Sequence, residues 1–97
     1  MKLQYQLGKL AQNDLENIWE YTFNNWTTKQ VDKYVNQIIK QIELLCKNPE
    51  IGRSIFEIKP NYRMKKVNSH LFIYKVETQI LKVDRILHER MDIQNQV

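Results

Sequence analysis

Cysteine, glycine and proline are scarce in this chain of 97 residues, and each scarcity narrows the possible functions. Cys46 is the only cysteine, so neither an intramolecular disulfide nor a cysteine zinc cluster can form, which suits a reducing cytoplasm. The two glycines, Gly8 and Gly52, cannot make a glycine-rich phosphate loop, and no His-x-x-x-His or Cys-x-x-Cys pair supplies metal ligands. We therefore expect no metal and no other cofactor.

Long apolar runs are also missing. No segment approaches the roughly 18 consecutive apolar residues of a membrane-spanning helix, and the N-terminus lacks the apolar stretch of a signal peptide. The length supports one hydrophobic core and leaves no room for a second domain or a linker. We expect a single domain over residues 1–97 that is soluble and cytoplasmic.

Acidic residues are the minority among the charged ones. There are 11 of them against 15 lysines and arginines, which gives a net charge of +4. All the arginines follow Pro49, and guanidinium groups recognise phosphates and carboxylates through paired hydrogen bonds. The charge therefore suits a phosphate-bearing or acidic partner, without separating nucleic acid from an acidic protein.

Hydrophobic periodicity predicts a strand and two helices in the first half. Apolar residues alternate over residues 3–7, which is typical of a strand with one buried face. From residue 9 to about residue 26 they recur every three or four positions, as on one face of an amphipathic helix. Thr27 and Gln30 have the spacing of a capping box that starts a second helix, which Pro49 ends. Two helices joined at Thr27 form an antiparallel hairpin, and a sheet must cover its apolar faces.

The second half predicts three strands of an antiparallel sheet. In chain order the segments are a loop at 49–60 with room for a short strand at 54–58, a half-exposed, edge-like strand at 62–67, a central strand at 70–77 that is apolar on both faces, and a returning strand at 80–87. Strict alternation in the last strand would put Leu81, Val83, Arg85 and Leu87 on one face. The predicted fold class is α+β, with an N-terminal strand, a helix hairpin and a C-terminal antiparallel sheet in the order β-α-α-β-β-β.

Basic residues gather around the exit of the last predicted strand. Arg85, His88 and Arg90 stand there, and a strand end can present two guanidinium groups and an imidazole at one edge of a sheet. His88 can serve as a general acid or base or donate to a phosphate, but a lone histidine there is also typical of a surface or packing residue. Arg63 and Lys65 lie on the neighbouring strand, so we expect four cations to converge on this edge.

Arg85 and the large aromatic residues also have purely structural interpretations. Either Arg85 packs its alkyl stem on the core and extends its guanidinium to the rim, or it pairs with a buried carboxylate such as Asp14 or Glu16. Trp19 and Trp26 fall on the helical stripes, which favours core packing over stacking on nucleic acid.

Several short motifs, in order along nearly the whole chain, resemble the ParE toxins of bacterial type II toxin–antitoxin modules, within the wider RelE/ParE superfamily. The matching segments are Asp14-Leu15-x-x-Ile18-Trp19-x-Tyr21-Thr22, Asn48-Pro49-x-x-Gly52-Arg53, Ser69-His70-x-x-x-Tyr74, and Arg85-Ile86-Leu87-His88-x-Arg90-Met91-Asp92. The family fold is a helical hairpin on a small antiparallel sheet, which agrees with the element order above.

The resemblance implies a toxin that inhibits or poisons DNA gyrase and needs no small-molecule chemistry. A cognate ParD-like antitoxin would neutralise it by laying a helical and extended segment across the apolar surface of the helices and sheet. The residues expected to bind the target are Arg63, Lys65, His88 and Arg90. The residues expected to bind the antitoxin are Trp19, Trp26, Phe72 and Tyr74.

Two alternatives remain open from the sequence. The RelE branch cleaves messenger RNA on the ribosome, and Arg63, Arg85 and His88 could imitate part of its catalytic set. The chain lacks the C-terminal tyrosine expected of many such nucleases. The other alternative is a module that has lost toxicity and serves only as a partner for a DNA-binding antitoxin.

Overall fold

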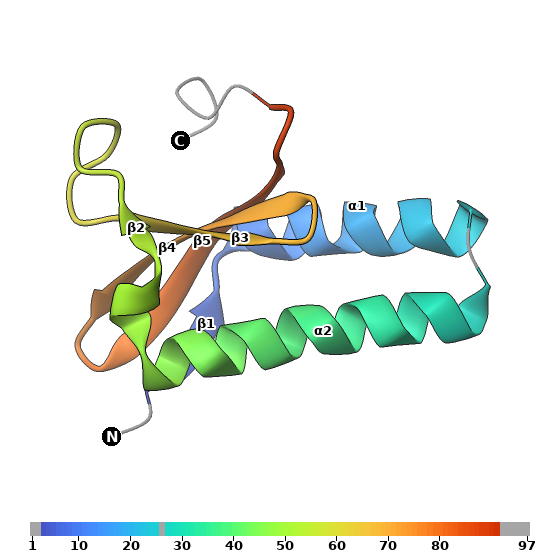
Figure 1. Ribbon diagram of the computed structural model, residues 1–97, viewed down its shortest axis with the longest axis horizontal. Helices are drawn as coiled ribbons and strands as arrows, with labels where there is room; N and C mark the ends of the chain where they lie inside the picture. The colour runs from blue at the N-terminus through green and yellow to red at the C-terminus, as the bar shows by residue number, and fades with distance from the viewer. Residues whose placement is uncertain (1–2, 26, 92–97) are drawn as a thin grey trace.

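Two helices pack against one five-stranded sheet in the computed structural model, which describes residues 3–25 and 27–91 (Figure 1). The elements are β1 Gln4–Leu7, α1 Lys9–Asn25, α2 Thr28–Lys47, a 3-10 turn η1 Pro49–Ile51, β2 Arg53–Ser54, β3 Arg63–Val67, β4 His70–Glu77 and β5 Ile80–His88. The α+β class and the predicted element order are confirmed, with the short β2 added. No helix in the described ranges is long and apolar enough to cross a membrane.

The predicted capping box fixes the start of α2. The Thr27 hydroxyl accepts a hydrogen bond from the Gln30 N–H at 3.3 Å, and the Gln30 side-chain oxygen accepts one from the Thr27 N–H at 3.2 Å. These bonds satisfy two N–H groups that the first turn of a helix leaves without partners. Pro49 follows Asn48, the C-cap of α2, and begins the 3-10 turn. Proline has no N–H to continue the hydrogen bonds of α2, so the helix ends before it. The two helices therefore run antiparallel, as Figure 1 shows.

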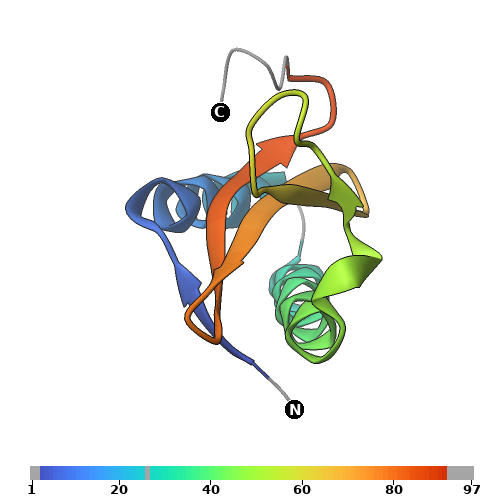
Figure 2. The ribbon, with the colours of Figure 1, turned by 90° about the vertical axis from the view of Figure 1, so that its left-hand side faces the viewer.

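The strands lie in the order β1-β5-β4-β3-β2, and the sheet is strongly twisted (Figure 2). β2 to β5 pair antiparallel as expected, whereas β1 runs parallel to β5. After β1, the helices α1 and α2 carry the chain to the opposite edge of the sheet, where β2 begins. The short strand expected at 54–58 is wrong: only Arg53–Ser54 pairs, against Arg63 and Met64 of β3. β3 is therefore covered by a neighbour at its first two residues.

A β-bulge changes the face of every residue at the end of β5. Tyr74 pairs with Val83 but the preceding Ile73 pairs with Arg85, so Asp84 is an extra residue on β5. Val83 therefore packs in the core beneath the helices, whereas Leu87 packs in a smaller cluster on the opposite face. The prediction that Val83, Arg85 and Leu87 share one face is wrong, because it assumed unbroken alternation.

The main core lies between the helices and the sheet. Its fully buried large side chains include Ile38, Ile42 and Leu45 of α2 and Phe72 and Tyr74 of β4. Each such side chain stabilises the fold by about 1.5–3 kcal/mol. The smaller cluster of Ile55, Ile73 and Leu87 lies on the other face, under the loop between β2 and β3. The two clusters together hold the end of β5 rigid, where the candidate residues stand.

Candidate functional site

A cleft opens where the end of β5 meets the two helices. Its volume is about 490 Å³, and its walls come from α1, from Tyr34 of α2, and from the ends of β4 and β5. The residues that line it are Asp14, Asn17, Ile18, Tyr21, Tyr34, Ser69, His70, Ile86, His88 and Met91. Apolar walls with a few polar groups are typical of a surface that receives side chains of a ligand or partner.

Two imidazole rings stand side by side in this cleft. The rings of His70 and His88 lie 5.4 Å apart at 82°, in an edge-to-face contact. The Tyr34 hydroxyl lies 2.6 Å from His70 Nδ1. Burial, and then the neighbouring His88, lower the pKa of His70, while burial raises the pKa of Tyr34. His70 and Tyr34 are therefore both neutral at neutral pH, and the contact between them is a hydrogen bond between uncharged groups.

His88 reaches the cleft with one ring nitrogen already in use. Its Nδ1 accepts a hydrogen bond from the Arg90 N–H at 3.1 Å, which places the proton of the neutral ring on Nε2. The imidazole can therefore offer one N–H to a partner. Among the described residues, no three histidine, cysteine or acidic side chains gather as metal ligands.

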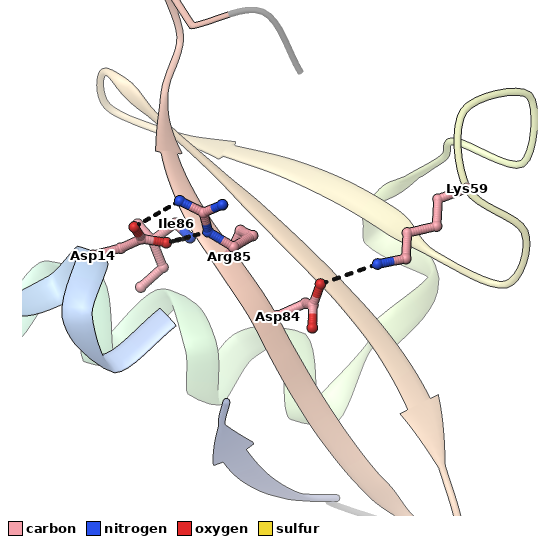
Figure 3. A network of polar contacts seen from close by, with 5 residues as sticks. All are labelled: Asp14, Lys59, Asp84, Arg85 and Ile86. Carbon is pink, nitrogen blue, oxygen red and sulfur yellow. Dashed lines mark hydrogen bonds and ion pairs between the residues drawn. The ribbon is translucent and has the colours of Figure 1, made fainter. Parts of the chain in front are cut away.

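Arg85 pairs with a carboxylate, which is one of its two predicted interpretations. Its Nε and Nη2 donate to Asp14 Oδ2 and Oδ1 at 2.8 and 3.0 Å, and Asp14 Oδ2 also accepts from the Ile86 N–H at 3.0 Å (Figure 3). β1 pairs with β5 only as far as Val83, so Asp14 of α1 serves the strand edge beyond it. The guanidinium fastens α1 to β5 and is not presented to a target.

The expected convergence of four cations is wrong. Arg63 pairs across the sheet with Tyr74, which pairs with Val83, whereas His88 lies five residues further along β5. At the usual rise of a strand this is roughly 15 Å, so Arg63 lies level with the middle of β5 and not with its end. Arg63 also donates from Nη1 to the Gly52 carbonyl at 2.7 Å. The sequence pattern predicts which strands lie near Arg63 and Arg90, but it does not specify the register between those strands.

Only part of the predicted basic rim remains near the end of β5. Arg90 is exposed there, next to Glu89, whose carboxylate lies 2.9 Å from Lys66 Nζ. That lysine holds the pKa of Glu89 below its usual value. Lys65 is partly buried and lies opposite Phe72 on the helix side of the sheet. The rim that reaches solvent thus consists of His88 and Arg90, beside a neutralised pair.

Phe72 and Tyr74 are not surface residues, although they were expected to bind an antitoxin. Both side chains have no exposed surface. The Tyr74 hydroxyl accepts from the Gly52 N–H at 3.0 Å and donates to the Pro49 carbonyl at 2.5 Å. A Cβ on Gly52 would lie 2.1 Å from that hydroxyl, so the loop motif and the β4 motif fit only with glycine there. Both residues act inside the fold, because β4 is central and covered on both faces.

Two aromatic side chains of α1 do reach the surface beside the cleft. Trp19 is 44% exposed and Tyr21 is 68% exposed, so the expectation that Trp19 packs in the core is only half right. Trp26 lies outside the described residues. The sequence missed Tyr34 and His70 as parts of the cleft. Tyr34 and His70 are 36 positions apart in the sequence, so no local pattern could show that they meet.

Comparison with known proteins identifies the family of this chain. Residues 5–93 match the family described as the ParE toxin of the type II toxin–antitoxin system parDE. Toxin ParE1 of Mycobacterium tuberculosis (strain H37Rv) is 37% identical over 94 residues, which cover 96% of each chain. Toxin ParE of Escherichia coli is 31% identical over 90 residues, covering 92% of this chain and 87% of the other.

The fold has a counterpart among solved structures. A chain of the chromosomal ParDE TA system from P. aeruginosa superposes with a TM-score of 0.76 at 17% identity, covering 90% of this chain and 96% of that one. At that identity the likeness concerns the fold alone. With a family match that runs from β1 past the end of β5, the chain belongs to the ParE toxin family of type II toxin–antitoxin systems.

Proposed function

We propose that this ParE-family toxin inhibits or poisons DNA gyrase and that a ParD-like antitoxin neutralises it. The family match over residues 5–93 carries the proposal. The arrangement of the basic residues favours gyrase over messenger RNA as the target. A ribonuclease needs cations and an acid or base around one phosphate, but Arg85 is held by Asp14 and Arg63 lies far from His88.

The antitoxin binds along the exposed side of α1 and the adjoining cleft. Trp19 and Tyr21 offer large, partly exposed rings there, and Ile18 and Ile86 form the apolar cleft wall. An amphipathic helix placed in such a groove buries apolar surface at each turn. Phe72 and Tyr74 are fully buried and make no direct contact with the antitoxin.

The target contacts the end of β5. Arg90 is exposed and His88 presents its Nε2–H from a strand held in place by the Asp14–Arg85 pair. Lys65 of β3 contributes from nearby, because it lies two residues before Val67, which pairs with His70. Arg63 lies level with Val83, near the middle of β5, and is not part of this contact.

A supercoiling assay tests the proposal directly. Purified toxin should block supercoiling by gyrase or accumulate cleaved DNA, and Arg90→Glu should lose the effect while it still folds and binds antitoxin. Lys33→Glu is the matched control, since Lys33 is an exposed lysine on α2 and should leave inhibition unchanged. No effect of the unmodified protein at micromolar excess would contradict the proposal.

A further inference from the structure

The sheet face opposite the helices carries an unusual cross-strand pair of like charges. Lys75 of β4 lies directly opposite Lys82 of β5, and both side chains point away from the main core because their neighbours Tyr74 and Val83 point into it. Like charges in this position destabilise a sheet. A single carboxylate, that of Glu77, lies 3.1 Å from each ammonium group. One carboxylate therefore pairs with two ammonium groups, and the three side chains together keep one positive charge.

An aromatic ring extends this row of cations. Lys59 lies 4.4 Å and Lys75 5.3 Å from the centre of the Tyr62 ring, so the ring holds two ammonium groups near it. Lys59 reaches from the loop between β2 and β3 to Asp84 on β5, 3.3 Å away, as Figure 3 shows. Glu77, and then Tyr62, raise the pKa of Lys75, so this lysine stays charged at neutral pH.

Two hollows flank Tyr62 and Lys75. One of about 250 Å³ includes Lys82 and Asp84, and another of about 380 Å³ includes Phe56 and Arg63. Phe56, which lines the second hollow, is 67% exposed. Three cations stand on this face, Lys59, Lys75 and Lys82, against two acids, Glu77 and Asp84. Arg63 lies opposite Tyr74 on the helix side of the sheet and is not part of this face. The surface keeps one positive charge and has an aromatic ring at its edge.

An excess of cations could attract either an acidic protein or a nucleic acid, and the aromatic residue decides between them. An acidic segment needs only the lysines, whereas an exposed ring beside a row of cations matches the way single strands are held, with bases stacked and phosphates neutralised. We propose that this face, comprising Phe56, Tyr62, Lys75 and Lys82, binds single-stranded nucleic acid. Phosphates contact Lys75 and Lys82, and a base stacks on Phe56. This goes beyond the gyrase proposal and does not depend on it.

Fluorescence anisotropy with a labelled single-stranded DNA of about 12 nucleotides tests the proposal on the purified protein alone. Lys75→Gln and Phe56→Ala should each weaken binding at least about fivefold, since a phosphate contact and a base stack are lost. With phosphates at Lys75 and Lys82, two contacts in all, log Kd should change with log salt with a slope of about 1.4. Single-stranded RNA of the same length should bind similarly, and duplex DNA more weakly.

Matched controls come from the helices. Lys33→Gln removes an exposed lysine of α2, and Tyr21→Ala removes a ring that is 68% exposed, almost the same as Phe56. Both should stay within about twofold of the unmodified protein. Thermal unfolding should show that Lys75→Gln is folded and no less stable, because it removes one of two opposed lysines.

Four results would overturn the inference. They are no binding at low salt, equal loss in the helix controls and the sheet variants, tighter binding of duplex than of single strand, and full displacement by polyglutamate at equal charge concentration. The last result would assign the surface to an acidic protein. Because no gyrase is present, each result is independent of the supercoiling assay.

Discussion

Asp14→Ala should lower the free energy of unfolding by more than a substitution on a surface helix usually does. The Asp14 carboxylate accepts three hydrogen bonds, and the Asp14 and Arg85 side chains are only 14% and 16% exposed. Removing one member of a buried pair costs about 3–5 kcal/mol, because the other charge is left without a partner. Residual exposure puts our expectation near the lower limit, about 3 kcal/mol.

Urea denaturation followed by circular dichroism measures this loss. With a slope of about 1.5 kcal/mol per molar urea, the midpoint should fall by about 2 M. Asp14→Asn keeps one acceptor oxygen and should lose less. Adding Arg85→Met to Asp14→Ala should restore at least half the loss, because no unpaired guanidinium remains.

An exposed ion pair provides the control for this experiment. Arg53 and Glu57 lie 3.3 Å apart, with side chains 60% and 64% exposed, so Arg53→Ala should cost no more than about 0.5 kcal/mol. If Asp14→Ala costs as little as Arg53→Ala, the pair does not fasten α1 to β5 and the reasoning fails.

Three further outcomes follow from the same contacts. Tyr74→Phe should cost about 2 kcal/mol in urea, because the Gly52 N–H loses its buried acceptor; a loss below about 0.5 kcal/mol would contradict that. Lowering the pH from about 7 to 5 should destabilise the protein, since burial lowers the pKa of His70 and the unfolded chain, titrating near 6.5, takes up the proton first. His70→Gln should reduce that pH dependence, and an unchanged slope would refute the assignment. Trp19→Ala should cost only about 2 kcal/mol because the ring is half exposed, yet weaken antitoxin binding at least tenfold in calorimetry; a loss of 4–5 kcal/mol would make Trp19 a core residue.

Local periodicity made the helices and most strands predictable. The apolar stripe of α2 and the Thr27–Gln30 capping box depend on residues within a few positions of one another, and the structure confirms both. The two-residue β2 left too short a pattern to recognise. The bulge at Asp84 could not be read either, because an inserted polar residue beside Arg85 looks like ordinary alternation.

The candidate site was harder to predict, because its contacts join distant parts of the chain. Asp14 and Arg85 are 71 positions apart, and sequence left their pairing as one of two interpretations. The register that separates Arg63 from His88 depends on how three strands align, which no local pattern specifies. Lys75 and Lys82 were visible as cations, but only their direct opposition gives them a joint role.

One culture experiment tests most directly whether this ParE-family protein acts on gyrase. The protein is induced without antitoxin, and DNA breaks and messenger RNA cleavage are followed in the same cells. We expect growth arrest with DNA damage and intact messages, and rescue by Arg90→Glu. Cut messages with undamaged DNA would point to the RelE-type nuclease instead. Vigorous growth at high expression would mean a non-toxic antitoxin-binding module.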